Sequence, residues 1–352
     1  NPWPGEMFPP PSIGYLQGAI LARGVEVKAL DLDAALCEPD DYDIIGVTFH
    51  SFSVQHARRI REHFKSWLVC GGHHPSALPG QMIAIGYDQV VIGEGENAMI
   101  DILNGDRTQI KDRSNQHYKS INDIPFPNYS GLSHTDNVII SSRGCPFRCN
   151  FCASTSFWGN KWKSRSAENV IAEINHFGYK TWMFEDDNFT ANKIRAIEIC
   201  KGVRGSWQCA SRAESLDDEL CAELKRSGCH TVWLGIESFS QSSLDRCGKN
   251  TTVERMIKGI ETAERHGIAT MCQFIIGLPG DTIEDIKQTA RIRRRVRMSR
   301  YGVNIAWVLP GTNIYAKAKE KGMSDEVYLQ SGAPFYTFEQ SIETLRYWAT
   351  LI

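Results

Sequence analysis

Three closely spaced cysteines are the residues of this sequence best suited to chemistry. Cys145, Cys149 and Cys152 are separated by three and then two residues. In a loop, this spacing lets three thiolates converge on one metal centre. A structural zinc site needs a fourth ligand nearby, and the next cysteine is Cys200. Three thiolates on a 4Fe-4S cluster instead leave one iron open, which indicates a reactive site. Unrelated loop cysteines are the alternative.

The cysteine segment follows the first of six expected strand–helix units. Six consecutive units of this kind predict a curved parallel sheet, a partial (β/α)6 barrel, with its chemistry at the carboxyl ends of the strands. We expect this domain over residues 138–318, followed by a short segment at 319–352. The expected strands are Val138–Ser142, Thr181–Phe184, Trp207–Ala210, Thr231–Gly235, Ala269–Ile276 and Val303–Val308.

The first hundred residues also alternate between helix and strand. Apolar strands separated by helical segments predict a parallel sheet covered on both faces, an open α/β domain of the doubly wound kind over residues 1–104. Its ligands should bind at the carboxyl ends of the strands. Residues 105–137 are polar and rich in turn formers, which predicts a linker. The expected elements are helices at Ile13–Leu21 and Val54–Phe64 and strands at Val25–Leu30, Asp43–Phe49, Trp67–Cys70 and Asp88–Ile92.

The cysteine triplet at the end of the first strand of a six-unit barrel resembles the radical S-adenosylmethionine (SAM) enzymes. The resemblance implies that the open iron is chelated by the amino and carboxylate groups of SAM. It continues through the segments after the later strands, which surround SAM in that family. A surface ion-pair role is the alternative for two of these residues, Arg212 and Glu237. The expected SAM contacts are Phe151, Glu185, Asp186, Arg212, Glu237, Ser238, Gly277 and Pro310.

The first half resembles the Rossmann-like cobalamin-binding domain that precedes the radical module in one subgroup of the family. The resemblance is carried by Pro9–Leu16, Gly71–Pro75 and Gly93–Glu96, and it implies a first strand upstream of Asn1. The Asp-x-His-x-x-Gly string of mutase-type domains is missing. Cobalamin should therefore bind without a motif histidine on cobalt, with His50 as the alternative ligand. The expected cobalamin contacts are Pro11, Thr48, His50, Ser51, Phe52, Gly71, Gly72, His73, Pro75, Gly93, Glu94, Gly95 and Glu96.

Three rival interpretations start from the same half. Gly93–Ala98 matches the dinucleotide fingerprint G-x-G-x-x-A, but it closes the domain and carries two carboxylates that would repel a pyrophosphate. The adjacent His73 and His74 suggest metal ligands, but neighbouring residues on an extended chain point apart, which favours polar lining of a pocket. Methylthio-transferring relatives need three more cysteines there, and only Cys37 and Cys70 lie in this half.

Composition places the chain among ordinary globular proteins. Its 352 residues are 42% hydrophobic and 23% charged, and no apolar run reaches the roughly 18 residues of a membrane span. Lys plus Arg number 39 against 41 Asp plus Glu, so nucleic-acid binding over the whole surface is not expected. Eleven cysteines, an odd number, favour a reducing compartment such as the cytoplasm.

Other chemically active residues have plain structural interpretations. The eight cysteines outside the triplet are expected mostly as small buried hydrophobes. The basic run Arg291–Arg300 is expected to be a solvated helix face, with an acidic substrate or nucleic acid as the alternative. Trp158, Trp162 and Trp182 are expected in the core, with a wall of the substrate cavity as the alternative.

The resemblance implies a cobalamin-dependent radical SAM enzyme. A cluster reduced by a donor such as flavodoxin or ferredoxin would cleave SAM, and the 5'-deoxyadenosyl radical would take hydrogen from an unreactive carbon. Methylcobalamin would pass a methyl group to that carbon, and a second SAM would remethylate cobalt. C-methylation of a small-molecule or peptide substrate is the leading interpretation. The alternatives are ring formation, ring contraction or oxidation, a cobalamin-free enzyme, and a non-catalytic cobalamin or iron–sulfur sensor.

Overall fold

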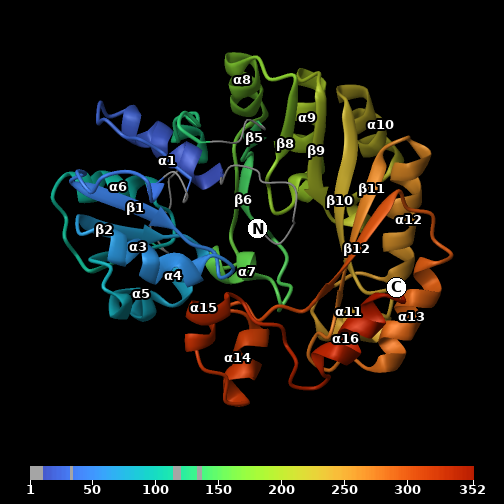
Figure 1. Ribbon diagram of the computed structural model, residues 1–352. Helices are drawn as coiled ribbons and strands as arrows, with labels where there is room; N and C mark the ends of the chain where they lie inside the picture. Colours follow the sequence, from blue (N-terminus) through green and yellow to red (C-terminus); the bar gives the residue numbers. More distant parts are fainter. Residues whose placement is uncertain (1–10, 32–34, 114–119, 133–136) are drawn as a thin grey trace.

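Two parallel sheets with helices packed on them form the protein, so the fold class is α/β (Figure 1). The computed structural model describes residues 11–31, 35–113, 120–132 and 137–352. The smaller sheet comes from the first third of the chain, and the larger sheet comes from the remainder. The prolines before Pro11, part of the cobalamin-domain resemblance, lie outside the described residues.

The smaller sheet has four parallel strands in chain order, β1-β2-β3-β4. Leu68 and Cys70 of β2 pack with α3 and α5, whereas Val69 packs with α1 and α6, so helices cover both faces. The elements are α1 (Pro11–Leu21), β1 (Ile44–Thr48), η1 (Val54–His56), α3 (Ala57–His63), β2 (Trp67–Gly71), α4 (His73–Ala77), α5 (Pro79–Ile85), β3 (Gln89–Ile92), α6 (Glu96–Leu103) and β4 (Ile110–Asp112).

Two expectations for this half were wrong. The segment Val25–Leu30 is not a strand, although Val25 and Val27 pack on the core beside α1 and α6. A strand needs a neighbour for its hydrogen bonds, and the described residues place none beside this segment. Conversely, the predicted linker contains a strand that was not expected. This strand, β4, pairs with β3 through Val90 and Ile110. This strand has only three residues and is polar, so the sequence pattern does not reveal it.

The larger sheet has six parallel strands in the order β12-β11-β10-β9-β8-β5, and all six expected strands are present. Helices pack along its outer face (Figure 1). β12 begins at Arg300, three residues before the expected start. The elements are β5 (Val138–Ile139), β8 (Thr181–Phe184), β9 (Ser206–Ser211), β10 (Cys229–Glu237), β11 (Ala269–Ile276), β12 (Arg300–Ile305), α8 (Ala167–Phe177), α9 (Lys193–Gly202), α10 (Asp218–Ser227), α12 (Val253–Arg265) and α13 (Ile283–Arg293).

Side chains alternate between the two faces of the larger sheet. Along β11, Cys272 and Phe274 are buried under the outer helices, whereas Met271 and Gln273 on the other face remain partly accessible. The side chains that are fully buried along this strand therefore lie on the helix-covered side.

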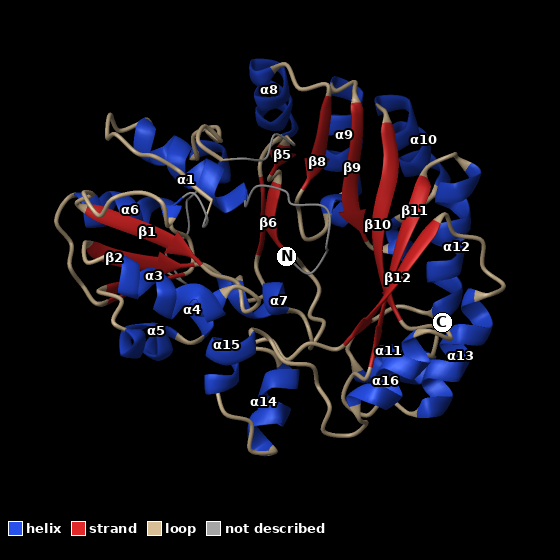
Figure 2. Cartoon of the chain, viewed as in Figure 1, coloured by secondary structure: helices blue, strands red, loops and turns tan. Residues whose placement is uncertain are grey.

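Short elements complete the fold around the carboxyl ends of the larger sheet (Figure 2). The carboxy-terminal segment joins the two halves, because Tyr328 of α15 packs in the core of the smaller sheet and Leu345 of α16 packs in that of the larger. None of the described helices is long and apolar enough to cross a membrane. These elements are η2 (Ile121–Asp123), β6 (Ser142–Gly144), α7 (Ala153–Phe157), β7 (Trp162–Ser164), η3 (Phe189–Ala191), η4 (Ala213–Ser215), α11 (Gln241–Arg246), α14 (Asn313–Glu320), α15 (Glu326–Ser331) and α16 (Ile342–Ala349).

Candidate functional site

The cysteine loop, Cys145–Cys152, leaves β6 and is fastened at its middle by Asn150. The backbone N–H of Asn150 donates to the carbonyl of Cys247 at 3.1 Å, and its side-chain amide donates to the carbonyl of Arg246 at 2.7 Å. Its own carbonyl accepts from the N–H of Asn313 at 3.0 Å. The loop is therefore held between α11 and α14, beyond the ends of the strands.

The three thiols of this loop share one environment. Cys149 is buried, and Cys145 and Cys152 are partly accessible. Burial raises the pKa of Cys152 to about 11 and also raises that of Cys145, and the nearby Cys149 adds to both shifts. Among the residues that the structure describes, no three metal-ligating side chains converge as for a single ion. Three neighbouring thiols are nevertheless the donor set of an iron–sulfur cluster, so these residues fit one.

Arg212 supplies a positive charge beside the cysteine loop. It follows β9, is 5% exposed, and donates from Nη1 to Sγ of Cys149 at 3.7 Å. Its guanidinium lies 3.9 Å from the ring centroid of Phe147, pairs with Glu214 and donates to the carbonyl of Lys249. Its charge acts to lower the pKa of Cys145, against the larger opposing effect of burial. The alternative of a surface ion pair is wrong for Arg212, because the side chain is buried.

Glu237 stands at the end of β10 in a strained backbone conformation. Its φ of 63° is unusual for a residue other than glycine, and the strand pairing shifts register beside it. Nζ of Lys249 lies 2.8 Å from its Oε1, and both side chains are buried. A Cβ at Gly235 would lie 2.6 Å from the same oxygen, so this glycine makes room for the pair. Glu237 is therefore buried as well, and not a surface residue.

The remaining strand-end residues fall around the same edge of the sheet. Phe151 packs against the apolar cluster that holds Leu278 and Val308. The hydroxyl of Ser238 lies 2.9 Å from that of Thr289. Gly277 has φ of 75°, and Pro310 is buried at the start of the loop after β12.

Asp186 and its neighbours have different surroundings, although all three follow β8. Asp186 is buried and accepts hydrogen bonds from the backbone and the hydroxyl of both Ser141 and Ser142, at 2.6 to 3.0 Å. Its carboxylate thus fixes the turn between β5 and β6. Glu185 and Asp187 are exposed to water, yet burial of their surroundings raises the pKa of both. Asp186 is therefore used by the turn, whereas Glu185 and Asp187 are accessible carboxyls in desolvated surroundings.

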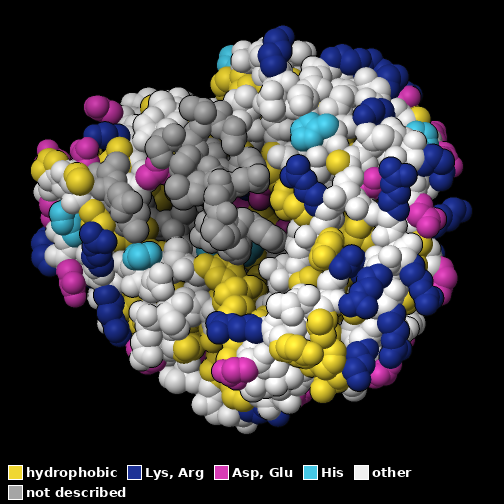
Figure 3. All heavy atoms as spheres, turned by 45° about the vertical axis from the view of Figure 1, so that its right-hand side comes forward, with side chains coloured by type: hydrophobic (Ala, Val, Ile, Leu, Met, Phe, Trp, Pro, Cys, Tyr) yellow, Lys and Arg dark blue, Asp and Glu magenta, His cyan; other side chains and the backbone are white. Residues whose placement is uncertain are grey.

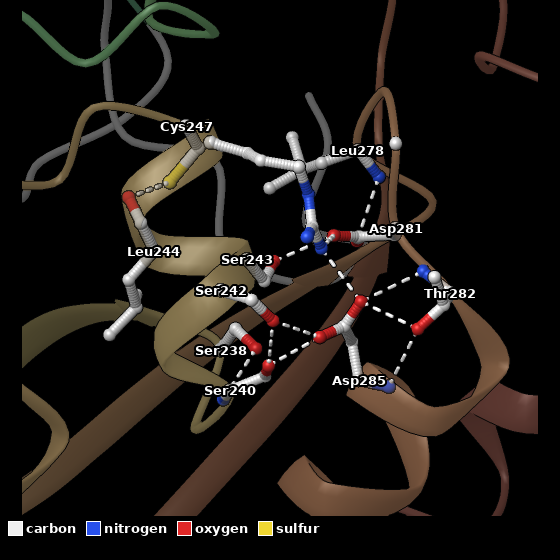
Figure 4. A network of polar contacts seen from close by, with 12 residues as sticks. Ser238, Ser240, Ser242, Ser243, Leu244, Cys247, Leu278, Asp281, Thr282 and Asp285 are labelled. Carbon is white, nitrogen blue, oxygen red and sulfur yellow. Dashed lines mark hydrogen bonds and ion pairs between the residues drawn. The ribbon is translucent and has the colours of Figure 1, made fainter.

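A polar network ties the loop after β11 to α11 and so to the cysteine loop (Figure 4). Asp281 accepts from the N–H of Leu278 at 3.0 Å and from the Ser243 hydroxyl at 2.6 Å. Asp285 pairs with Arg246 at 2.7 Å, and the carbonyl of Arg246 holds Asn150. The loop after β11 and the cysteine loop are therefore held by the same polar network.

The strand-end loops of the smaller sheet reach the same region. The ring of His73 is stacked on that of Phe157 of α7, with centroids 4.3 Å apart, and lies 5.6 Å from the ring of His50. Burial lowers the pKa of His73 to about 4, with a further contribution from His50. His50 is accessible, yet burial of its surroundings lowers its pKa too. Both histidines are therefore neutral at pH 7.

The neighbouring His74 has other partners, although the two histidines begin helix α4 and do not lie on an extended chain as expected. It is fully buried, with Nδ1 at 3.0 Å from Ser51 Oγ and Nε2 at 2.8 Å from Gln81 Oε1. Phe52 of the same loop as Ser51 packs against Trp307, with centroids 4.9 Å apart. The expected cobalamin contacts Ser51 and Phe52 are thus engaged with protein side chains.

Glycines shape the edge of the smaller sheet. Gly72 has φ of 96°, and a Cβ there would lie 2.6 Å from Oγ1 of Thr48. A Cβ at Gly71 or Gly95 would make ordinary contact with Val91 at 3.7 Å or with Leu16 at 3.8 Å, so close packing does not require glycine there. Glycine at these positions leaves the backbone free to approach a flat ligand. Pro11 begins α1, Pro75 is buried in α4, and Gly93 has φ of 86°.

Glu94 and Glu96 have a partner that the sequence analysis did not assign. Both pair with Arg143, two residues before Cys145. Three other residues of the site, Lys249, Phe147 and Phe157, were also missed. Only Arg143, Phe147 and Phe157 carry a sequence signal, since they lie in or beside the cysteine segment; nothing local marks Lys249.

The other singled-out residues mostly have structural roles. Seven cysteines outside the triplet are buried, as predicted, and Cys37 is exposed. Trp182 is buried and stacked on Trp207, which confirms a core position, while Trp158 and Trp162 are half-buried. The basic run after Arg291 lies on the side where Lys and Arg side chains gather over the outer helices (Figure 3). Most of its arginines are exposed, as expected, but the run is not a helix face, because α13 ends at Arg293 and Arg300 begins β12.

Comparison with known proteins identifies the larger half. Residues 139–292 match the family model described as the radical SAM superfamily. An uncharacterized methyltransferase of Pyrococcus horikoshii is 30% identical, covering 89% of this chain and 79% of that protein. The bacteriochlorophyllide d C-8(2)-methyltransferase of Chlorobaculum tepidum is 25% identical, covering 80% and 70%.

Solved structures with the same fold cover both halves. The radical SAM methyltransferase TsrM from Kitasatospora setae, with cobalamin and a [4Fe-4S] cluster bound, superposes with a TM-score of 0.73 at 19% identity, over 90% of this chain and 76% of that one. The cobalamin-dependent SAM radical enzyme OxsB gives a TM-score of 0.61 at 18% identity, over 95% and 55%. The chain therefore belongs to the radical SAM superfamily, and it has the fold of that superfamily's cobalamin-dependent enzymes.

Proposed function

We propose that this protein is a cobalamin-dependent radical SAM enzyme that methylates an unactivated carbon. The observation that carries the proposal is the contact between the two halves at one place. His73, from a strand-end loop of the smaller sheet, stacks on Phe157, five residues after Cys152. Loops that fit a corrin and loops that fit a cluster thereby face one another. Relatives named as methyltransferases support methylation as the outcome.

The proposal assigns a role to each part of the chain. Residues 1–104 together with β4 (Ile110–Asp112) form the cobalamin-binding Rossmann-like domain, the rest of 105–137 the linker, 138–318 the partial barrel and 319–352 the closing segment. The helices on both faces of the smaller sheet and the six-strand order of the larger sheet support these assignments. A cytoplasmic location and an electron donor such as flavodoxin or ferredoxin belong to the same proposal.

The residues that would hold the cofactors follow from their positions. The cluster would bind Cys145, Cys149 and Cys152, and SAM would lie near Phe151, Arg212, Glu237, Gly277 and Pro310. Cobalamin would rest on the edge formed by Thr48, His50, Gly71–His73, Gly93 and Gly95. When bound, the cluster supplies the electron that cleaves SAM, and cobalamin carries the methyl group.

The chain's own residues prepare this region. Arg212 holds a positive charge next to Sγ of Cys149. The neutral His73, with its pKa of about 4, adds no charge beside the corrin edge. Glu185 and Asp187 are accessible polar groups in desolvated surroundings at the end of β8. Together these groups offer positioning and partial exclusion of water.

A ring-forming reaction is the second candidate, favoured by one comparison. An anaerobic magnesium-protoporphyrin IX monomethyl ester cyclase of Rubrivivax gelatinosus is 25% identical over 82% of this chain, which covers 62% of the cyclase. A cyclase of this kind would cleave SAM without transferring a methyl group.

Anaerobic reconstitution tests the proposal. The protein would be rebuilt with iron, sulfide and cobalamin, then given dithionite and SAM. We expect a corrin absorption band, 5'-deoxyadenosine and S-adenosylhomocysteine, and the last product separates methylation from cyclisation. Replacing Cys145, Cys149 and Cys152 with alanine should abolish iron binding and both products. Cys37→Ala, which changes an exposed cysteine elsewhere, is the matched control. Zinc, or no metal, at the triplet in the wild type would refute the proposal.

A further inference from the structure

A buried ion cluster joins the smaller sheet to the start of the cysteine loop. Nη1 of Arg143 lies 2.6 Å from Oε1 of Glu94, and Nη2 of the same guanidinium pairs with Oε1 of Glu96. The three side chains are only 8%, 3% and 6% exposed. Burial acts to raise the pKa of Glu96, but the charge of Arg143 lowers it overall, so the carboxylate is ionised. We call these three residues the Arg143 cluster.

Stability is a poor explanation for such a cluster. Removing charges from water costs about as much as their mutual attraction returns, so a buried ion pair is often no more stabilising than apolar residues of equal volume. Its best-supported use is to fix how two elements meet. The guanidinium of Arg143 suits that use, because its planar fork engages two carboxylates and thereby sets orientation as well as distance.

The position of Arg143 determines where the cysteine loop begins. Arg143 lies in β6, paired with Lys163 of β7, and Gly144 follows with φ of 79°. A Cβ at Gly144 would lie 2.0 Å from the carbonyl oxygen of Lys161 and 3.1 Å from Cβ of Trp158. The chain is therefore locked between Arg143 and Cys145. The guanidinium also lies 5.9 Å from the ring centroid of Trp158.

The other end of the cluster is fixed with equal firmness. Glu94 and Glu96 follow β3 in the loop that opens α6, and Glu96 is the first residue of that helix. The N–H of Gly93 donates to the Ser76 hydroxyl at 3.1 Å, which anchors this loop to α4. Movement of the β3–α6 loop would thus move Arg143, and with it Cys145.

We infer that Arg143 is a positioning residue that sets the separation and orientation of the cobalamin edge and the cysteine loop. The inference rests on the proposed function, because it assumes cofactors on both sides. Loss of the Arg143 cluster should leave each cofactor bound but misplace one relative to the other. A shift of about 1 Å between reacting groups lowers a rate by up to about 100-fold.

Pulsed electron paramagnetic resonance provides a readout apart from activity. Cob(II)alamin and the reduced cluster are both paramagnetic, and their dipolar coupling reports the distance between them. The main variant combines Arg143→Met, Glu94→Gln and Glu96→Gln, which leaves no unpaired buried charge. We expect unchanged iron and corrin content, a changed or broadened coupling, and a ratio of S-adenosylhomocysteine to 5'-deoxyadenosine that falls about tenfold.

Two further variants sharpen the test. Arg143→Lys keeps the charge but loses the fork, and it should also broaden the coupling, so the test survives if the triple variant fails to fold. Arg58→Met is the control, because Arg58 pairs with Glu326 between the first half and the carboxy-terminal segment, yet both side chains are exposed. A wild-type coupling and product ratio in the folded Arg143 variants would overturn the inference alone. A wild-type protein that binds no cobalamin would instead overturn the proposed function and the inference together.

Discussion

Nη1 of Arg212 lies 3.7 Å from Sγ of Cys149, the only buried thiol of the cysteine loop. The same guanidinium is held by Glu214, by the carbonyl of Lys249 and by the ring of Phe147. The charge is thus fixed at the sulfur rather than free to swing away. A fixed cation and a hydrogen bond at a cluster sulfur are known to tune the reduction potential of iron–sulfur clusters.

Arg212→Met should make the cluster harder to reduce. Reduction adds a negative charge, and loss of the neighbouring cation removes its stabilisation, so the potential should fall by about 60 mV, which is a tenfold change for one electron. A redox titration of the reconstituted cluster, followed by electron paramagnetic resonance, measures this shift. Arg148→Met is the matched control, because Arg148 precedes Cys149 but is exposed and screened by water. Equal shifts in both variants would contradict the assigned role.

Thiol accessibility gives a second prediction. Before cluster assembly, the exposed Cys37 should react fastest with a thiol reagent. Cys145 and Cys152 are partly accessible but have raised pKa values, so they should react more slowly. The other eight cysteines are buried, so they should react only after denaturation. Assembly of the cluster should then protect Cys145 and Cys152 and leave Cys37 as the single reactive site. Mass spectrometry of labelled peptides checks this order, and unchanged labelling of Cys145 in the assembled protein would count against cluster ligation.

The sequence predicted the parts of the site that depend on local pattern. The triplet spacing and the six βα units are repeated short-range signals, and the structure contains all six strands. Asp186 shows where this reasoning ends. Its neighbour Glu185 is also a carboxylate after the same strand. Only Asp186, however, accepts hydrogen bonds from Ser141 and Ser142. A position at a strand end predicts that a residue lies near a ligand. It does not predict which carboxylate already accepts hydrogen bonds from other residues of the protein.

Contacts between residues far apart in the chain could not be predicted from the sequence, for a related reason. Glu94 and Arg143 are 49 residues apart, and their contact depends on how the two sheets pack. The glutamates were assigned to cobalamin because they lie in a strand-end motif, and Arg143 was not assigned at all. Similarly, the segment at Val25–Leu30 has the composition of a strand but no described neighbour to pair with.

Lys249→Met should destabilise the protein strongly. Nζ of Lys249 lies 2.8 Å from Glu237, and loss of one partner leaves a buried carboxylate unpaired, at a cost of about 3–5 kcal/mol. Adding Glu237→Gln should restore much of the free energy of unfolding, because no buried charge then remains. Urea unfolding of the two single variants and the double variant forms a thermodynamic cycle. Additive losses in the double variant would mean that the pair does not interact.

The pH dependence of stability tests the burial of His73. Its pKa is about 4 in the folded protein, against about 6.5 for an exposed histidine in the unfolded chain. Between these values the unfolded chain binds the proton more readily, so the free energy of unfolding falls as pH drops from about 6.5 toward 4. At pH 5 this histidine alone should lower the free energy of unfolding by up to about 2 kcal/mol.

Burial lowers the pKa of His50 and His74 as well, so His73→Gln should reduce the loss of stability at low pH without removing it. Thermal unfolding at pH 7 and pH 5, followed by circular dichroism, compares this variant with the wild type and with His63→Gln, which changes an exposed histidine on the outer surface. Because His73 faces Phe157 across the two halves, an identical loss in all three proteins would show that water reaches the ring freely and that the halves are not closed around it.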